Sequence, residues 1–393
     1  MNETIQGALI LMKSAITGEP EQLPDQFNAG PVINMMSRQG VLSMGYLGAL
    51  NCGVSPDHPG MVRILDQYCI DVITSERQLK HIDRICKAFE ENGIEYMPVK
   101  GTLLKHMYPN HELRRMSDAD ILIREEKYSQ IIPVMQQLGF REAGESDHEH
   151  IWENEHLKVE LHKHLIPSYN KDLYSYFGTG WDLAKIQKGC RWEMTQEDAY
   201  IYNFIHFAKH YRDSDVHCRF VVDLWVHQRQ CPELDMQYIR QRLRDMKMEI
   251  FFDNIMKVID CWFADGQWDD RTELITRVLF HVDIEDKMHQ YEVAQSTRKA
   301  TQSGSVKQVR QASRIRRIFP DRENMDFSYP QWKKKPLPIA WCLRWGDLAF
   351  HRRDVVKNRM GDKNRVSEQE VENYRQDLEY VGLQFSDGVA LPD

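Results

Sequence analysis

The run SDADILI places the strongest limit on how this chain can fold. Asp118 and Asp120 are two positions apart, and apolar Ala119, Ile121 and Ile123 alternate with them. Successive side chains of a β-strand point to opposite faces, so the run predicts a strand with one buried apolar face and two carboxylates on the other. Carboxylates this close raise each other's pKa unless a cation lies between them. The sequence therefore predicts a site for a hard cation, Mg²⁺ or Mn²⁺.

A second alternating run, LKVELHKHL, places Glu160 on the polar face of another strand. If the two strands are neighbours, Asp118, Asp120 and Glu160 converge. Three carboxylates can hold two metal ions roughly 3.5–4 Å apart, one on a triphosphate and one that lowers the pKa of an attacking hydroxyl. We therefore predict that these three residues are the catalytic metal ligands, with Glu160 as a ligand or a general base.

The run PVKGTLLKHMY predicts a short strand that ends at Lys100, Gly101 and Thr102 and leads directly into a helix. Glycine lets the backbone approach a phosphate closely, and a helix N-terminus offers free N–H groups. We expect this turn to bind phosphate, with Lys100 adding a point charge. The predicted phosphate contacts are completed by three residues just before the aspartate strand: Arg114, Arg115 and Ser117.

The spacing of apolar residues predicts an α+β layer between helical regions. Residues 1–77 follow a helical pattern, residues 78–180 alternate strand-like and helical runs, and residues 181–300 return to helix. Residues 301–393 are predicted to form a basic connection and a C-terminal extension that is loosely held after Asn364. We predict an α+β fold, in which a small mixed sheet is flanked by N-terminal helices and a larger C-terminal helical region.

Composition narrows the classes of function. The net charge of −8 and the pI near 6.1 argue against a generally basic surface for nucleic acid, but suit a small anionic substrate held through a metal. No apolar run approaches the roughly 20 residues that cross a bilayer, and no C-x-x-C pair occurs among the eight cysteines. We expect a cytoplasmic protein without a membrane partner. The basic run Arg314–Arg317 either contacts RNA or forms a solvated surface.

Two residue pairs in the helical region are each spaced four apart, His206 with His210 and Arg219 with Asp223, so each pair shares a helix face. We predict that His210, Arg219 and Asp223 face the cleft and help to place the nucleotide or its acceptor. A zinc site is the alternative for the histidines, and it requires a further ligand.

Together, the runs PVKGTLLKHMY, RRMSDADILI, LGF and VELH resemble the nucleotidyltransferase superfamily with its polymerase-beta-like palm. Within it they resemble the bacterial group of uncharacterised nucleotidyltransferases. Thr102 replaces the second glycine of the superfamily pattern, and fifteen residues lie between it and Asp118. The resemblance implies that Asp118 and Asp120 are the metal-binding pair and Glu160 the third acid. A weaker similarity extends over residues 28–355.

Three functions are compatible with these features. The first is a nucleotidyltransferase that moves a nucleoside monophosphate from a nucleoside triphosphate, such as ATP, to a small molecule, a peptide, a protein or a tRNA. The second is a metal-dependent hydrolase with a cluster of His162, His164, His206 and His210. The third is an inactive palm that only binds a nucleotide or a partner. The presence of three carboxylates in strand contexts favours the first.

Overall fold

The computed structural model describes residues 2–24, 27–167, 171–281, 284–303, 335–350 and 366–385, with a few positions between 319 and 332. These residues fall into two compact units. The first contains the described parts of Met1–Asp283 with Tyr380–Leu383, and the second contains those of Ile284–Glu379 with Gln384 and Phe385. The predicted metal and phosphate residues all belong to the first unit.

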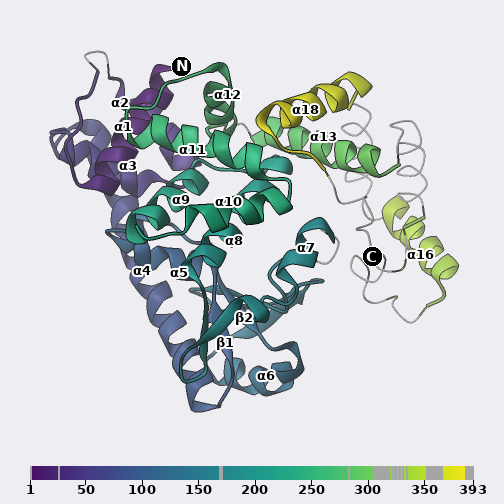
Figure 1. Ribbon diagram of the computed structural model, residues 1–393. Helices are drawn as coiled ribbons and strands as arrows, with labels where there is room; N and C mark the ends of the chain where they lie inside the picture. The colour runs from purple at the N-terminus through teal and green to yellow at the C-terminus, as the bar shows by residue number, and fades with distance from the viewer. Residues whose placement is uncertain are drawn as a thin grey trace. The chain divides into compact units, whose positions relative to one another are not determined.

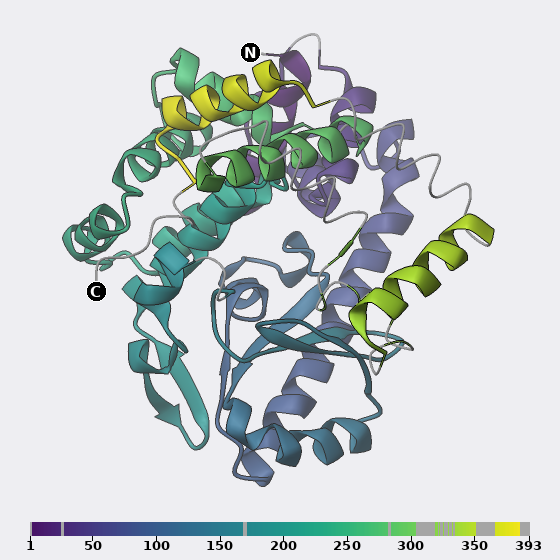
Figure 2. The same ribbon diagram turned by 90° about the vertical axis from the view of Figure 1, so that its right-hand side faces the viewer.

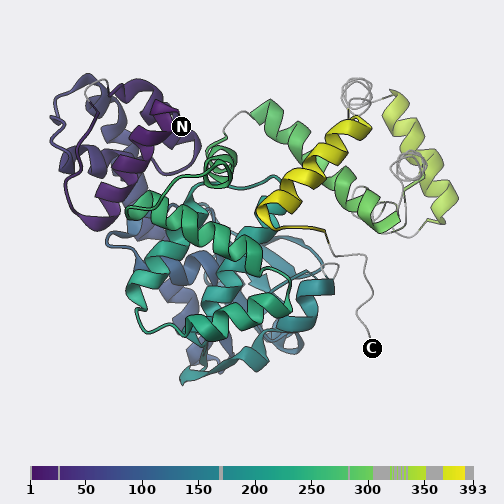
Figure 3. The ribbon, with the colours of Figure 1, turned by 45° about the horizontal axis from the view of Figure 1, so that its top comes forward.

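Three short helices begin the first unit: α1 (Glu3–Thr17), α2 (Ala29–Arg38) and α3 (Leu42–Asn51). The side chain of Asn2 caps α1 by accepting a hydrogen bond from Thr4 N, and α1 ends at Gly18 with φ +76°. A Cβ at Gly48 of α3 would overlap the backbone of Leu11, so α1 and α3 pack closely because this residue is glycine. These helices form the purple group in Figure 3.

The next elements form a seven-stranded mixed sheet in the order β3-β4-β5-β2-β1-β7-β6. Its pairs β2/β5 and β1/β7 are parallel, and its other pairs are antiparallel. The runs IEYMPVK, DADILI and LKVELH contribute β1, β2 and β5, so the predicted α+β fold with a mixed sheet is confirmed. The strands are β1 (Tyr96–Pro98), β2 (Asp118–Ile123), β3 (Arg141–Glu145), β4 (Glu149–Glu153), β5 (Lys158–His162), β6 (Ala184–Lys188) and β7 (Arg191–Met194).

One face of this sheet is the apolar core of the unit. The long helix α4 (Pro59–Glu91) and the helix α6 (Tyr128–Gln137) cover it, as Figures 1 and 2 show. Ala119, Ile121 and Ile123 of β2 are buried in this core with Val159 and Leu161 of β5. The alternation in the sequence therefore places apolar side chains against α4 and α6, and the polar side chains of the same strands point to the other face.

Residues 184–194 differ from the prediction that a helical pattern resumes after about residue 181. They form the hairpin β6–β7 and extend the sheet beyond the predicted palm limit of residue 180. Gly189 has φ +59° in the turn, and Cys190 N donates to Glu90 Oε2 at the end of α4. Most of β6 is exposed, so its residues lack the strong apolar alternation that reveals a strand in a sequence.

The remaining helices of the first unit follow the sheet. Thr195 caps α8 by accepting a hydrogen bond from Asp198 N, as the sequence suggests for a helix start. Short 3₁₀ turns occur at Lys105–Met107, His111–Leu113, Glu125–Lys127 and Trp181–Leu183. The helices are α5 (Lys100–Leu104), α7 (Lys171–Phe177), α8 (Gln196–Arg212), α9 (Arg219–Gln230), α10 (Met236–Asp245), α11 (Glu249–Phe263) and α12 (Asp270–Leu279).

The second unit contains α13 (Ile284–Ser303), α16 (Leu337–Phe350) and all but the last two residues of α18 (Glu368–Val381). The expectation of a loosely held tail after Asn364 is wrong for α18, because Val371 and Leu378 recur on one helix face and are buried. His289 of α13 lies 2.8 Å from Glu370 of α18.

The basic run at residues 314–317 lies outside the described residues. In the part of the chain that the structure describes, no helix is long and apolar enough to span a membrane.

Candidate functional site

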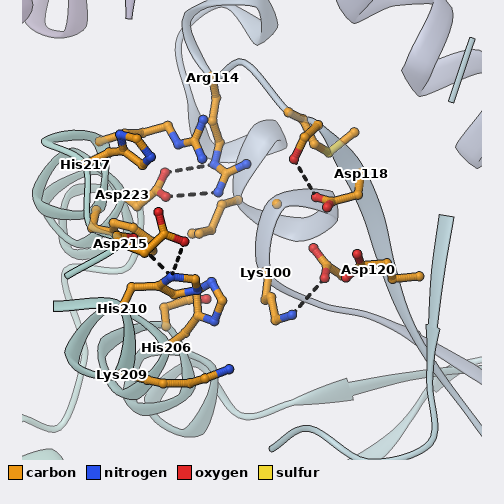
Figure 4. Close-up of a pocket in the computed structure, with 18 of the residues that line it drawn as sticks. Lys100, Arg114, Asp118, Asp120, His206, Lys209, His210, Asp215, His217 and Asp223 are labelled. Atoms are coloured by element: carbon orange, nitrogen blue, oxygen red, sulfur yellow. Dashed lines mark hydrogen bonds and ion pairs between the residues drawn. The ribbon is translucent and has the colours of Figure 1, made fainter. Parts of the chain in front are cut away.

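The polar face of the sheet borders a cavity of about 470 Å³, whose opposite wall is formed by α8, α9 and the connection between them. Figure 4 shows Asp118 and Asp120 on one side of this cavity and His206, Lys209 and His210 on the other. The lining residues that carry charge or a titratable group are Lys100, Arg114, Asp118, Asp120, His148, Glu149, Glu160, His206, Lys209, His210, Asp215, His217, Arg219 and Asp223.

Strand pairing brings the three predicted carboxylates to the cavity. In the parallel register of β2 and β5, Asp120 is opposite Glu160 and Asp118 is opposite Lys158, so all of them share one face. Lys158 Nζ lies 2.6 Å from Glu160 Oε1 and 3.9 Å from Asp118 Oδ2. Ser117 Oγ donates a hydrogen bond to Asp118 Oδ1 at 2.9 Å, and Ser117 also lines the cavity.

Asp120 is 5% exposed and is held by three neighbours. Lys100 Nζ lies 2.8 Å from its Oδ1, and His162 Nε2 lies 2.9 Å from the same oxygen. Its backbone N donates to Thr102 Oγ1 at 2.8 Å. Burial by itself raises the pKa of Asp120, but the Lys100 ammonium and the His162 hydrogen bond outweigh burial and hold this pKa below its ordinary value. Asp120 is therefore ionised.

Asp118 has a different environment. Burial and the charges of Asp120 and Glu160 raise the pKa of Asp118 to about 6. The candidate ligand atoms of Asp120, Glu160 and His162 lie within 4.8 Å of one another. Asp118 belongs to neither candidate group among the described residues. A divalent cation would relieve the repulsion between Asp120 and Glu160, and their oxygens suit Mg²⁺ or Mn²⁺, so this group fits such an ion.

Lys100 lies at the start of α5 with φ +46°, a left-handed conformation that is uncommon for a residue with a side chain. Burial by itself lowers the pKa of Lys100, but the adjacent Asp120 carboxylate outweighs burial and raises it above its ordinary value. In Figure 4 the ammonium points at Asp120. The strained backbone and the ion pair together hold a fixed positive charge beside the candidate metal ligands.

The predicted phosphate turn is only partly open to the cavity. Helix α5 has five residues, Thr102 N donates to Val99 O at 3.1 Å, and Thr102 is 2% exposed. The cavity lining given by the described residues includes Gly101 but not Thr102. A Cβ at Gly101 would lie 2.7 Å from Arg114 Nη1, so this glycine leaves room for a guanidinium. Thr102 instead holds the backbone of Asp120.

The two predicted arginines have separate environments. Arg114 is buried and binds Asp223 of α9 through two hydrogen bonds, Nε to Oδ1 at 2.8 Å and Nη2 to Oδ2 at 2.9 Å. Tyr108 Oη donates to the same Asp223 at 2.7 Å. The Arg115 side chain is exposed, and its carbonyl oxygen accepts a hydrogen bond from Arg219 Nη1 at 2.7 Å. Arg114, Arg219 and Asp223 thus line the cavity. Arg115 takes part only through its carbonyl oxygen, which binds Arg219.

Reasoning from the sequence missed several cavity residues, among them His148 and Glu149, which form a candidate group of metal ligands with His162. Strand β4 pairs antiparallel with β5, so Glu149 is opposite His162 on the polar face. Burial and the charge of Glu160 raise the pKa of Glu149 to about 7. The sequence carries a signal for this strand, because His150 and Trp152, which are buried, alternate with Glu149 in the run EHIWE. Lys209 of α8 and Asp215 and His217 beyond it also line the cavity and were missed, whereas His206, which the sequence analysis paired with His210, lines it as well.

The histidines predicted for a hydrolase do not gather into one cluster. Groups of possible metal ligands among the described residues contain His148 and His162, but not His164, His206 or His210. The rings of His206 and His210 lie 4.5 Å apart, and burial with the neighbouring charge of His210 lowers the pKa of His206 well below its ordinary value. These rings form part of the α8 wall. The hydrolase built on these four histidines therefore has no structural basis.

A family model described as "Uncharacterised nucleotidyltransferase" matches residues 25–264 of the chain. The matched range contains the whole sheet and every residue that lines the cavity. No curated protein and no solved structure matches the chain. The match ends at α11, before the second unit begins.

Proposed function

The chain belongs to the uncharacterised nucleotidyltransferase family, and on this premise we propose that it moves a nucleoside monophosphate from a nucleoside triphosphate, such as ATP, to an acceptor. The proposal depends on one observation. The parallel pairing of β2 with β5 places Asp120 opposite Glu160, with Asp118 on the same face, at the border of a cavity that also holds Lys100 and Arg114. Carboxylates and fixed cations that face one cavity suit phosphoryl-type transfer.

In the proposed reaction an oxygen of the acceptor forms a bond to the α-phosphorus, and the bond from that phosphorus to the bridging oxygen breaks. Pyrophosphate leaves, and the acceptor loses its proton. Asp118, Asp120 and Glu160 would hold Mg²⁺ or Mn²⁺, and when bound the ion would polarise phosphate oxygens and lower the pKa of the attacking hydroxyl. Glu160 serves as a further metal ligand or as the general base.

Fixed cations around the cavity would place the triphosphate. Lys100, Arg114 and Arg219 line it, and the Nη1 atom of Arg114 faces Gly101 while Nε and Nη2 bind Asp223. Arg114 therefore keeps one guanidinium edge for a phosphate oxygen, and its position is set before substrate arrives. His210 on the opposite wall is available to the nucleotide or its acceptor. Thr102 and Arg115 support this arrangement through backbone contacts.

The acceptor class stays as broad as the sequence left it: a small molecule, a peptide, a protein or a tRNA. The family indicates that a nucleotidyl group is transferred, but it does not indicate the acceptor. The acceptor is selected by particular side chains of the site, which the fold does not fix. We expect the reaction to take place in the cytoplasm, since the eight cysteines show no paired spacing typical of an exported disulfide scaffold.

The test uses each nucleoside triphosphate in two forms, labelled at the α-phosphate or at the γ-phosphate, with Mg²⁺ or Mn²⁺ and a cell extract as the source of acceptors. We expect α-label on one class of acceptor and γ-label in pyrophosphate. The variant with both Asp118→Asn and Asp120→Asn should lose this transfer, whereas Asp57→Asn, at an exposed aspartate of the same unit, should keep it. Release of γ-label as free phosphate without α-transfer, or transfer that survives in the double variant, would contradict the proposal.

A further inference from the structure

We propose that His148, Glu149 and His162 form a second metal site that takes a nitrogen-preferring divalent ion, such as Zn²⁺ or Co²⁺. Their candidate ligand atoms lie within 4.8 Å of one another. His148 Nε2 is 3.2 Å from Glu149 Oε2, and His162 Nδ1 is 3.9 Å from the same oxygen. Bonds of about 2.0–2.1 Å in a tetrahedral zinc site place neighbouring ligand atoms about 3.3 Å apart. Small side-chain adjustments bring the three groups to that geometry.

The backbone sets this arrangement. The antiparallel register of β4 and β5 places Glu149 directly opposite His162. His148 precedes β4, and its carbonyl oxygen accepts a hydrogen bond from Lys163 N at 2.8 Å, which closes the end of the strand pair. The three residues therefore lie on paired β-strands or beside their last hydrogen bond, and rigid elements of this kind suit a metal site.

His162 supplies an independent observation. Its side chain is fully buried, and its Nδ1 atom has no hydrogen-bond partner among the described residues. Nε2 faces Asp120 Oδ1 at 2.9 Å, closer than the 3.4 Å approach of Lys100 Nζ. A hydrogen bond from Nε2–H to Asp120 places the ring proton on Nε2 and leaves the Nδ1 lone pair for a ligand. Metal-binding histidines usually donate their other N–H to a carboxylate in this way.

Glu149 supplies the negative charge. In the described part of the chain, no lysine or arginine nitrogen lies within 4.0 Å of its carboxylate, which lies beside the rings of His148 and His162 and beside Glu160. Lys100 and Lys158 are paired with Asp120 and Glu160. When its carboxyl group is ionised, Glu149 has no lysine or arginine partner among the described residues, and a metal ion from solution fits this place. Because His148 and Glu149 line the cavity, an ion held here keeps a coordination position open to water or substrate.

The donor set distinguishes this site from the carboxylates proposed for Mg²⁺ or Mn²⁺. Two imidazole nitrogens favour Zn²⁺ and related transition ions, whereas Mg²⁺ prefers oxygen donors. The inference goes beyond the proposed transfer reaction, because binding of this ion depends on His148 and Glu149, which the transfer reaction does not use, and is measured without a nucleotide. The two ideas can therefore succeed or fail separately.

The experiment titrates metal-free protein with Co²⁺ and follows the visible absorption of the bound ion. We expect one Co²⁺ per chain to bind in the presence of excess Mg²⁺ and to be displaced by Zn²⁺. His148→Ala and Glu149→Gln should each weaken this binding at least about tenfold, as expected when a ligand is lost. The matched control is His156→Ala, which removes an exposed histidine from the connection between β4 and β5.

Asp118→Asn separates the two sites, because Asp118 belongs to no candidate group with His148 among the described residues. It should retain Co²⁺ binding and lose α-label transfer. Equal loss of Co²⁺ affinity in Asp118→Asn and His148→Ala would place the ion on the carboxylates and overturn the inference. Absence of Co²⁺ binding to the unaltered protein, or displacement by Mg²⁺, would also overturn it. Absence of transfer with intact Co²⁺ binding would count against the proposed function alone.

Discussion

Lys100 Nζ lies 2.8 Å from Asp120 Oδ1 and provides this carboxylate with a permanent cation. Asp118, two residues earlier on the same strand face, has Lys158 Nζ 3.9 Å from its Oδ2, and Lys158 Nζ is closer to Glu160, at 2.6 Å. The two aspartates, which the sequence presents as equivalent, therefore differ in the pKa of their side chains. Asp118 is protonated more readily, and Asp120 stays ionised.

This difference predicts opposite effects on stability in buffer without metal. Asp120→Asn leaves the buried Lys100 ammonium without its counter-charge, so the free energy of unfolding should fall by about 3 kcal/mol. Asp118→Asn removes a repulsive carboxylate, so stability should stay equal or rise by up to about 1 kcal/mol. Urea unfolding with a chelator measures both values. Equal effects of the two substitutions would show that the ion pair with Lys100 does not distinguish them.

A pH dependence follows from the raised pKa values of Asp118, about 6, and Glu149, about 7. Each is higher in the folded chain than in the unfolded chain, so its stabilising contribution is complete below about pH 4 and is lost as pH rises through about 6 and 7. Without metal, the free energy of unfolding of the native protein should fall over this window relative to that of the double variant Asp118→Asn, Glu149→Gln. A divalent ion should reverse the fall at pH 7.

The comparison with that double variant isolates the two carboxylates from other groups that titrate in the same range. We expect a difference of about 1–2 kcal/mol between the two proteins across the window. If the native protein gained stability relative to the variant as pH rose, the direction of both pKa shifts would be wrong.

The proposed chemistry predicts that removal of a metal ligand affects the reaction step more than nucleotide binding. Asp118→Asn, Asp120→Asn and Glu160→Gln should each lower kcat at least about a hundredfold, because electrostatic stabilisation of the transition state is lost. The nucleotide Kd should change far less, since fixed cations also hold the phosphates. Steady-state transfer to an identified acceptor and equilibrium nucleotide binding give the two quantities. A large rise in Kd with unchanged kcat would assign these carboxylates to binding only.

Gly101→Ala should affect phosphate placement because its Cβ would lie 2.7 Å from Arg114 Nη1. Arg114 is held by Asp223 and has little freedom to retreat, so we expect its guanidinium to shift and transfer to fall about tenfold or more. Gly30→Ala is the control, because the nearest atom to its added Cβ is 3.5 Å away and the residue lies in helix α2. The same activity in both variants would argue that Arg114 does not contact the phosphates.

The buried pair of Arg114 and Asp223 should be essential to stability. Asp223→Ala leaves a buried guanidinium unpaired and should lower the free energy of unfolding by about 3–5 kcal/mol. Asp265→Ala, at an exposed position of the same unit, should change it by less than about 0.5 kcal/mol. The double variant Arg114→Met, Asp223→Leu should recover part of the loss, since neither charge then remains buried. If the double variant were as unstable as Asp223→Ala, packing rather than charge would explain the loss.

The sequence by itself determined which side chains share a face within each strand. Alternation in DADILI and VELH is a local property, because the two-residue repeat of a strand places Asp118 with Asp120 and buries Ala119 and Ile121. The same local patterns were sufficient for the α+β fold and for the family, both of which are confirmed. The exposed hairpin β6–β7 escaped notice because its residues lack an apolar repeat.

Only the tertiary structure decided which of these faces meet. Three contacts at the site join separate segments of the chain. Asp120 is opposite Glu160, Glu149 comes from β4, and Arg114 pairs with Asp223. Periodicity describes one element at a time, whereas strand order and helix packing depend on the burial of all apolar faces together. The ionisation of Asp118 and Asp120 also depends on the tertiary structure, because the neighbours that shift their pKa values come together only when the chain is folded.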